Sequence, residues 1–445
     1  MNYNNKSILV LGLSKSGIAA AKLANKLGAK VCLSEGKQPQ NQDSIVELTD
    51  LGIKVEVGGH SDDFINCADL VIVSPGIPPH SEVIRKIKEK NIEIISELEF
   101  AYLNSNTPFI IITGTNGKTT TTSLINYILS NNYNVEACGN IGLPPCDLVN
   151  KNLDYYVCEA SSFQLETSNT LTPLISIWTN FTPDHIDWHQ GLENYFNAKA
   201  KIFLGNQTPK YSIINAKDAN LLEFSKNING ELFYFGDDLG ANCCYIENDA
   251  IIYKQNNVKE YIINLGDCSI FGEHNYQNIM CSIITAKLLN IDNFVIKKCL
   301  MDFKAPAHRM EKVRQYNNIT FFNDSKATNP EASIVAINSF NNQNIVLIAG
   351  GRDKNTDLTE FCNSINKHIT SVILIGEATE RFKDNLLKFG FNNIYVENTL
   401  ENAIDKSIEL NPNVVLLSPA CASFDMFSGY EQRGDVFREY VLSRV

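Results

Sequence analysis

The sequence has little that marks a secreted, membrane-spanning or nucleic-acid-binding protein. Its twelve cysteines include no Cys-x-x-Cys pair, which in a long chain is typical of reduced, buried thiols. The net charge is −12 with no run of basic residues, which argues against a nucleic-acid partner. No apolar run is long enough to cross a bilayer, and residues 1–12 enter a predicted strand without a signal segment. We therefore expect a cytoplasmic protein without membrane insertion.

The composition is that of a globular protein with several domains. Hydrophobic residues make up 44% of the 445 residues and charged residues 20%, as in proteins with well-formed cores. Short apolar runs alternate with helical patterns, which predicts α/β domains. Polar, proline-containing segments at 104–108 and 301–307 are candidate hinges. They give three predicted domains, 1–103, 104–300 and 301–445.

The clearest motif is FIIITGTNGKTTTTSLIN, residues 109–126. A predicted strand leads into a glycine-containing turn and then a helix, so that backbone N–H groups and the helix N-terminus can hold a phosphate. Lys118 is placed to reach the terminal phosphates and the Thr119 hydroxyl to ligate Mg²⁺. Ile112 stands where a standard P-loop has its first glycine. An ordinary strand–helix turn is the less favoured alternative, because glycine, lysine and threonine all fall in the right context.

Two more predicted strands of this domain end in polar side chains. Glu159 follows the strand at 154–158, and His185 lies beyond the strand at 174–178. A carboxylate at a strand end beside a P-loop commonly holds the Mg²⁺ of the nucleotide. An isolated histidine is more often structural, but the ends of parallel strands gather at one edge of the sheet.

Lys199 lies in a predicted amphipathic helix, residues 192–204. Tyr195, Lys199 and Phe203 are spaced by four and share one face. A lysine between aromatic rings either extends its ammonium to water or is partly desolvated, and desolvation lowers a lysine pKa. A neutral amine can take up CO₂ and become a carbamate, an anionic metal ligand. The spacing alone favours the first interpretation.

The N-terminal segment has the pattern of a dinucleotide-binding fold with one exception. A strand at 7–12 leads into Gly12-Leu-Ser14-Lys15-Ser16-Gly17, and the next strand ends at Glu35. Ser14 stands where the fingerprint requires its middle glycine, which argues against an NAD-dependent oxidoreductase. Ser74 and Gly76 follow another strand, where a simple turn and a ligand contact are equally compatible with the sequence.

The last third of the chain also predicts an α/β sheet whose strand ends are polar. Strands at 319–322, 345–349 and 414–417 each run into a polar cluster. Before them, Asn275 and Asn278 lie where a helix is predicted to begin. These asparagines suit either capping of that helix or contact with a base edge.

Taken together, several motifs resemble the Mur ligase family, the ATP-dependent amide ligases of peptidoglycan precursor synthesis. They are Gly-Thr-Asn-Gly-Lys-Thr at 114–119, Glu159-Ala-Ser-Ser-Phe-Gln-Leu, His274-Asn-Tyr-Gln-Asn278, His308-Arg309 and Asp324-Ser-Lys326-Ala-Thr-Asn329. The match runs over essentially the whole chain, and the shortened P-loop is the family's own variant. The stretch 418–434 is most similar to the branch that adds D-glutamate to UDP-N-acetylmuramoyl-L-alanine.

The resemblance implies an N-terminal Rossmann-like domain, a central P-loop ATPase-type domain, a C-terminal Rossmann-like domain and a monomer. The implied ATP residues are Gly114, Thr115, Asn116, Gly117, Lys118, Thr119, Thr120, Asn278, Arg309 and Asp324. The implied ligands of two Mg²⁺ ions are Thr119, Glu159, His185 and Lys199 as a CO₂-derived carbamate. Lys118, His185 and Lys199 are the implied catalytic residues. The UDP-substrate residues would be Lys15, Ser16, Glu35, Lys37, Ser74, Gly76 and Asn140. D-glutamate would be held by Lys326, Thr328, Lys354, Ser423 and Phe424.

Some positions depart from the family pattern, and other functions compete. Lys201 is a weaker rival for the carbamate, Glu35 stands where Asp is more usual, and Arg352 where an acidic residue can occur. A sibling ligase with another amino acid and folylpolyglutamate synthase are the nearest alternatives, and the N-terminal domain disfavours the second. A P-loop NTPase without ligase activity is the alternative from another class.

Overall fold

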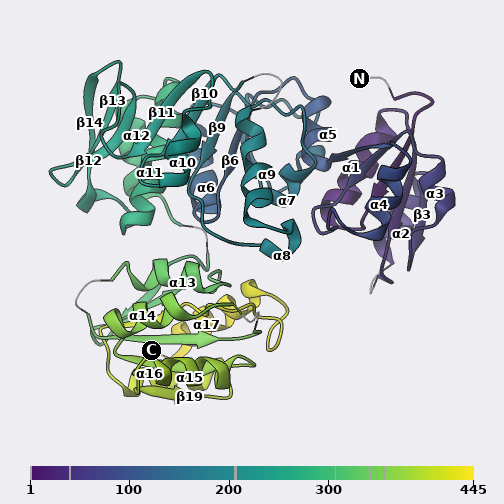
Figure 1. The fold of residues 1–445 in the computed structure, drawn as a ribbon. Coiled ribbons are helices and arrows are strands. Elements are labelled where there is room, and N and C mark those ends of the chain that lie inside the picture. Colours follow the sequence, from purple (N-terminus) through teal and green to yellow (C-terminus); the bar gives the residue numbers. More distant parts are fainter. Residues whose placement is uncertain are drawn as a thin grey trace. The chain divides into compact units, whose positions relative to one another are not determined.

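The computed structural model describes residues 3–39, 42–204, 208–305, 307–340, 343–353 and 356–444. The chain forms three β-sheets, each flanked by helices (Figure 1). It divides into two compact units, one containing the chain up to Ser269 with Tyr276–Phe303, the other Ile270–Asn275 with the chain from Lys304 on. The predicted α/β class with three sheets is confirmed, and the residue boundaries of the domains stay predictions.

The N-terminal sheet has five parallel strands in the order β3-β2-β1-β4-β5. Its central strand is a continuous apolar run, as expected when both faces of a parallel sheet are covered. The strands are β1 Ser7–Leu11, β2 Lys30–Glu35, β3 Lys54–Val57, β4 Leu70–Val73 and β5 Glu93–Ser96. The helices are α1 Lys15–Lys26, α2 Asp43–Asp50, α3 Asp62–Asn66, α4 Glu82–Glu89 and α5 Glu97–Leu103.

The middle sheet has nine strands in the order β14-β13-β12-β11-β10-β9-β6-β8-β7. It is parallel from β7 to β12, and β13 and β14 extend it antiparallel as a hairpin. The strands are β6 Phe109–Thr113, β7 Val135–Gly139, β8 Tyr155–Glu159, β9 Ile175–Trp178, β10 Tyr211–Asn215, β11 Glu231–Gly236, β12 Cys243–Glu247, β13 Ala250–Gln255 and β14 Val258–Asn264. The helices are α6 Lys118–Leu129, η1 Pro145–Asp147, α7 Ser162–Glu166, α8 Ile186–His189, α9 Leu192–Leu204, α10 Ala219–Ser225, η2 Leu265–Asp267, α11 Glu273–Leu288 and α12 Asn293–Asp302.

The third sheet has six strands in the order β15-β16-β20-β17-β18-β19 and lies in the second unit. Only its edge strand β15 runs antiparallel to its neighbour, among the described strands. The strands are β15 Glu311–Tyr316, β16 Ile319–Asn323, β17 Ile345–Gly350, β18 Ser371–Ile375, β19 Ile394–Val396 and β20 Val414–Leu417. The helices are α13 Pro330–Ile337, α14 Thr359–His368, α15 Thr379–Lys388, α16 Leu400–Glu409 and α17 Tyr430–Arg444.

Helix α5 joins the N-terminal sheet to the middle one through buried hydrogen bonds. Glu97 and Glu99 are both buried. The Glu97 carboxylate accepts from the backbone N–H of Cys146 at 2.7 Å, and the Glu99 carboxylate from that of Thr170 at 2.8 Å. Burial raises the pKa of Glu97 to about 7, despite the hydrogen bond from Cys146. These contacts lie within the first unit and hold its two sheets together.

Two sequence-based expectations concern cysteines and membranes. All twelve cysteines are free thiols, and most are buried. None of the described helices combines the length and apolar character that crossing a membrane requires.

Candidate active site

The loop between β6 and α6 has a backbone that requires glycine at two positions. Gly114 and Gly117 have φ values of +148° and +82°, a region that side chains rarely tolerate. A Cβ on Gly114 would also lie 1.9 Å from Thr179 Oγ1, and one on Gly117 would lie 2.5 Å from Asn278 Oδ1. Asn180 fixes the loop, since its Oδ1 accepts from the Asn116 N–H at 2.8 Å. Thr179 and Asn180 were not among the predicted site residues, although they follow β9, which pairs with β6.

Two lysines converge on one carbonyl of this loop. The Lys118 ammonium donates to the carbonyl oxygens of Gly114 and Thr115, both at 2.8 Å. Lys199 reaches the same Gly114 oxygen from α9, also at 2.8 Å. Thr120, on the first turn of α6, is buried. The sequence separates the two lysines by more than eighty positions, and the fold brings them to the same turn.

Lys199 is enclosed by protein. Its side chain is only 1% exposed, and its Nζ lies 4.8 Å from the centre of the Tyr195 ring. Burial lowers the Lys199 pKa well below its usual value, and the charge of Lys118 lowers it further. The Lys199 ammonium is therefore desolvated and does not extend to water. The Tyr195 hydroxyl in turn lies 3.1 Å from Thr115 Oγ1, so α9 is tied to the phosphate loop.

Glu159 is the last residue of β8, next to this loop, and only one of its carboxylate oxygens accepts a hydrogen bond among the described residues. Its Oε1 accepts from Asn140 Nδ2 at 2.8 Å, whereas its buried Oε2 has no hydrogen-bond partner among the described residues. A buried, unsatisfied carboxylate oxygen suits a hard cation such as Mg²⁺. No group of three His, Cys, Asp or Glu side chains in the described ranges could share a metal. A metal here would thus depend on Thr119, substrate oxygens or a modified Lys199 as well.

His185 precedes the one-turn helix α8 in a left-handed conformation. Its φ is +52°, and Gln190, just after the helix, has a φ of +58°. The imidazole packs on the Phe163 ring with centroids 4.7 Å apart, and its Nε2 lies 3.4 Å from Asp184 Oδ2. His185 is exposed, so a ligand can reach its side chain.

The ATP residues inferred from the resemblance are divided between the two units. Asn278 lies beside the phosphate loop, where its Oδ1 accepts from Thr121 Oγ1 at 3.1 Å. Because α11 begins at Glu273, neither Asn275 nor Asn278 is its cap, and the capping interpretation was wrong. Arg309 and Asp324 belong to the second unit.

Asp324 follows β16 in the second unit and is buried. Its carboxylate accepts from Ser418 Oγ at 2.8 Å and from the Met310 N–H at 3.2 Å. Burial raises its pKa to about 7, although Ser418 and the charge of Arg309 oppose the shift. The Asp324 carboxylate therefore links the loop after β16 to Ser418, just after β20, and to Met310, next to Arg309.

The described residues that are predicted to bind D-glutamate lie on two loops of the second unit. Hydrogen bonds from Arg433 link these loops. Its guanidinium donates to Ser325 Oγ at 2.9 Å and to the Cys421 oxygen at 3.1 Å, and it is 1% exposed. Lys326 Nζ lies 3.8 Å from the centre of the Tyr430 ring. Thr328 is half-buried, Ser423 buried and Phe424 67% exposed. Lys354 lies outside the described residues. Arg433 lies in the stretch 418–434 that resembles the family, but no local sequence pattern predicts its hydrogen bond to Ser325.

The predicted UDP-substrate residues of the N-terminal sheet surround the β1–α1 loop. Glu35 accepts from the N–H groups of Leu13 at 2.8 Å and Lys37 at 2.9 Å. Ser14 Oγ lies 2.9 Å from Ser16 Oγ and donates to Ser74 Oγ at 3.0 Å. Ser14 also accepts from Gly17 N–H and so caps α1, which places a side chain where a dinucleotide's phosphate would approach. Lys15, Lys37 and Gly76 are exposed.

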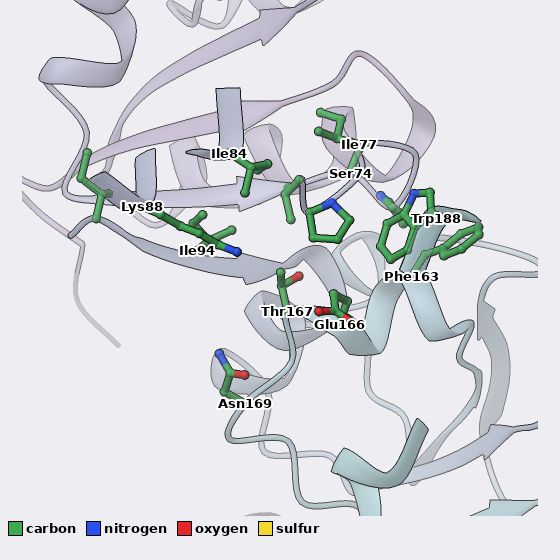
Figure 2. A pocket seen from close by; sticks show the side chains of 14 residues that line it. Ser74, Ile77, Ile84, Lys88, Ile94, Phe163, Glu166, Thr167, Asn169 and Trp188 are labelled. Carbon is green, nitrogen blue, oxygen red and sulfur yellow. The ribbon is translucent and has the colours of Figure 1, made fainter. Parts of the chain in front are cut away.

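A cavity of about 270 Å³ lies in the first unit, along β5 and beside α7 and α8 (Figure 2). Phe163 and Trp188 lie side by side at one end of it, and Lys88 lies at the other. Ser74 is the predicted UDP-substrate residue that lines it. The other lining residues are Val73, Pro75, Ile77, Pro79, Ile84, Ile92, Ile94, Glu166, Thr167 and Asn169.

Comparison with known proteins accounts for this arrangement. Three family models match: the Mur ligase MurD-like N-terminal domain over residues 6–96, the Mur ligase middle domain over 112–286 and the Mur ligase glutamate ligase domain over 308–421. The chain belongs to the Mur ligase family. Among Mur ligases it is 39% identical to the UDP-N-acetylmuramoylalanine–D-glutamate ligase of Thermoanaerobacter pseudethanolicus, over 99% of each chain. It is 38% identical to the enzyme of that name from Clostridioides difficile, again over 99% of each.

Solved structures share the fold at lower sequence identity. The Mur ligase MurC from Thermotoga maritima aligns with a TM-score of 0.60 and 19% identity, over 99% of this chain and all of the other. The folylpolyglutamate synthase of Mycobacterium tuberculosis aligns with a TM-score of 0.58 and 14% identity, over 75% of this chain and 92% of the other. The full-length match to MurC and the partial one to the folate enzyme agree with a Mur-type N-terminal domain.

Proposed function

We propose that this Mur ligase uses ATP to join D-glutamate to UDP-N-acetylmuramoyl-L-alanine, forming an amide. The observation that carries the proposal is the identity of 38–39% to ligases of that name over 99% of both chains. The matches to the MurD-like N-terminal, Mur ligase middle and glutamate ligase domain models support it. A sibling ligase would share the phosphate loop, but the N-terminal match is to the MurD-like model.

The reaction needs a leaving group, because a free carboxylate is a poor electrophile. An oxygen of the alanine carboxylate attacks the γ-phosphorus of ATP, and ADP leaves. The amine of D-glutamate then attacks the acyl carbon, the tetrahedral intermediate expels inorganic phosphate, and the nitrogen loses a proton to give the amide. The protein has to hold the three reactants in line and stabilise the charge of the transferred phosphoryl group.

The phosphate loop supplies the first part of that task. The backbone N–H groups of residues 114–120 and the N-terminus of α6 suit the phosphates. Lys118 now donates to two loop carbonyls, and a phosphate would compete for its ammonium. Asn278 beside the loop, with Arg309 and Asp324 of the second unit, would complete the ATP site.

The donor set suits magnesium, since it contains the unsatisfied Glu159 Oε2 and the Thr119 hydroxyl. Mg²⁺, when bound, would neutralise charge on the phosphates. Glu159 and Thr119 would hold one ion, and His185 with a carbamate on Lys199 would hold the second. Burial favours the neutral Lys199 amine, which is the form that reacts with CO₂. The imidazole of His185 would act as a ligand rather than as a base.

The two substrates would be held by opposite charge and by polar contacts in different domains. In the N-terminal domain, Glu35, Ser16 and Ser74 surround the β1–α1 loop and would bind the UDP moiety with Lys15, Lys37 and Gly76. Asn140 would bind it from the middle domain. The ammonium of Lys326 suits a carboxylate of D-glutamate, and we propose the same role for Lys354. Thr328, Ser423 and Phe424 would line the remainder of that site.

Phosphate release from ATP tests the proposal directly. The protein is incubated with UDP-N-acetylmuramoyl-L-alanine and ATP, and with D-glutamate, L-glutamate, meso-diaminopimelate or L-alanine as the acceptor. We expect release that requires D-glutamate, with one new amide detected by mass spectrometry. Lys118→Ala should lower the rate by about 10²-fold or more, as removal of one charge-stabilising group typically does. Lys388→Ala, an exposed lysine on α15, is the matched control and should retain activity.

Two results would refute the proposal in different ways. Release with another acceptor would identify a sibling ligase. Equal release with every acceptor and with none would identify a P-loop NTPase without ligase activity.

A further inference from the structure

His189, the last residue of α8, is a buried histidine to which the proposed reaction assigns no role. It is 3% exposed. Its Nε2 lies 2.9 Å from Ser162 Oγ, at hydrogen-bond distance. Its Nδ1 lies 3.5 Å from Glu166 Oε2 but makes no hydrogen bond among the described residues. Ser162 and Glu166 are the first and last residues of α7. One imidazole therefore reaches both ends of the short helix that follows Glu159.

A serine, a histidine and a carboxylate in a row are also the elements of a catalytic triad. Here the serine, the first residue of α7, is 2% exposed. A nucleophile must meet its substrate, and Ser162 has no open side. The arrangement is therefore structural. We call the three residues His189, Ser162 and Glu166, which link α8 to α7, the clamp.

Aromatic rings surround the clamp and connect it to His185. The His189 ring packs on Trp188, Tyr195 and Phe163, with centroid distances of 4.5, 5.3 and 5.7 Å. Phe163 also packs on His185, and Phe163 and Trp188 lie side by side at the cavity end seen in Figure 2. Movement of the His189 ring would therefore disturb the rings that support His185.

The turn that carries His185 depends on such support. Left-handed backbone at a residue other than glycine costs free energy and persists only where the surroundings impose it. The turn has such residues at both ends, His185 and Gln190. Its backbone bond runs from His189 N–H to the His185 oxygen at 3.1 Å, and Asn194 Nδ2 donates to the His189 oxygen at 2.9 Å. His189 is the buried side chain of this turn.

We infer that His189 is a positioning residue, which fastens α8 to α7 through its contact with Ser162, with the Glu166 carboxylate nearby, and so fixes the direction of His185. The consequence for catalysis rests on the proposed function, in which His185 is a metal ligand. The clamp itself does not depend on that function. It explains why a ligand on a strained, exposed turn would keep one orientation, as ligands do when neighbouring groups orient them.

Hydrogen–deuterium exchange tests the clamp without reference to activity. His189→Ala and Ser162→Ala should both speed exchange of the amides at 185–191, because each removes one side of the Nε2 contact. His189→Gln, whose amide can occupy the Nε2 position, should restore part of the protection. Exchange in the phosphate loop and α6 should stay as in the wild type. His368→Ala, a histidine at the end of α14, is the matched control.

Magnesium dependence tests the consequence. Mutation of residues that orient a metal ligand typically changes metal affinity or activity about 10- to 100-fold. We expect His189→Ala to raise the half-saturating Mg²⁺ concentration and lower kcat to this extent, with the KM for D-glutamate unchanged. Excess Mg²⁺ should recover part of the rate, and Mn²⁺ binding followed by electron paramagnetic resonance should weaken in parallel.

Three results would overturn the inference. They are unchanged exchange at 185–191 in both alanine variants, an equal rise of exchange throughout the middle domain, and a lower kcat without any shift in Mg²⁺ dependence or Mn²⁺ binding. If His189→Ala does not fold, Ser162→Ala and His189→Gln carry the test. A wild-type protein without acceptor-dependent phosphate release would refute the proposed function, while the exchange data would still decide on the clamp.

Discussion

At the scale of single residues, the environment of a side chain decides its chemistry more than its type does. Lys118 and Lys199 both donate to the Gly114 oxygen. Lys199 alone is enclosed to 1% exposure, and burial together with the charge of Lys118 lowers its pKa. Burial of this kind shifts an amine toward its neutral, nucleophilic form.

The first prediction concerns the carbamate on Lys199. Protein equilibrated with ¹³C-bicarbonate should show one carbamate carbon by ¹³C NMR, because a lowered pKa increases the fraction of the neutral amine that reacts with CO₂. The resonance should weaken as the pH falls, since protonation removes the reactive amine. Lys199→Ala should abolish it.

Lys201→Ala is the control for this prediction, because burial also lowers the Lys201 pKa. The Lys201 ammonium is engaged elsewhere, donating to the Glu166 carbonyl oxygen and to Asn169 Oδ1 at 3.3 Å. A resonance that survives Lys199→Ala and disappears in Lys201→Ala would assign the carbamate to the rival position.

At the scale of secondary-structure elements, α5 carries a buried acid that links two sheets. The folded pKa of Glu97 is about 7 against an ordinary 4.5. Between these values the folded protein keeps a proton that the unfolded chain releases, so stability falls as the pH rises from about 4.5 to 7 and then levels off. The shift corresponds to about 3 kcal/mol at pH 8.

The second prediction follows from this sign. Glu97→Gln removes the ionisation and keeps an oxygen for the Cys146 N–H, so its Tm should exceed that of the wild type at pH 8 and approach it at pH 5. Calorimetry from pH 5 to pH 8 measures the difference. Asp324 has a similarly raised pKa. It is present in both proteins, so its contribution to the pH dependence of the Tm is the same in both. Glu93→Gln, at the exposed start of β5, should follow the wild-type curve, and a gap that stays constant with pH would contradict the assignment.

The elements themselves were well predicted where the apolar pattern is strong. The helix expected at 192–204 is α9 in full, and the strand at 109–112 is β6 with one added residue. Strands β3, β5, β7, β12 and β15 were not predicted. β12 follows a polar loop closely, and the other four are edge strands of their sheets. Edge positions bury too little for their pattern to stand out.

At the scale of the whole molecule, the proposed ATP residues belong to different units. The phosphate loop and Asn278 are in the first unit, and Arg309 and Asp324 are in the second. If all of them contact one nucleotide, both units take part in binding it. Closure around substrates that excludes water is a common step of such enzymes.

The third prediction is that ligands make the protein more compact. Small-angle X-ray scattering with a non-hydrolysable ATP analogue, Mg²⁺ and UDP-N-acetylmuramoyl-L-alanine should give a smaller radius of gyration than the free protein. Lys118→Ala with the same ligands is the control and should change less. Identical curves with and without ligands would count against closure.

The sequence by itself determined the α/β class, the glycine-containing turn between β6 and α6 and the family. These depend on local patterns, namely apolar periodicity and glycines at fixed places, and such patterns are visible along the chain. Glu159 and His185 were likewise predicted as site residues because polar residues after buried strands are a local signal.

Only the tertiary structure decided what brings distant residues together. It placed Lys199 against the Gly114 oxygen, left Glu159 Oε2 unsatisfied, joined two loops through Arg433 and set His189 between the ends of α7. The physical reason is that desolvation and hydrogen bonding depend on all neighbours of a group, whatever their separation in the chain. No local pattern carries that information, so the state of Lys199 and the role of His189 could be argued only once the fold was known.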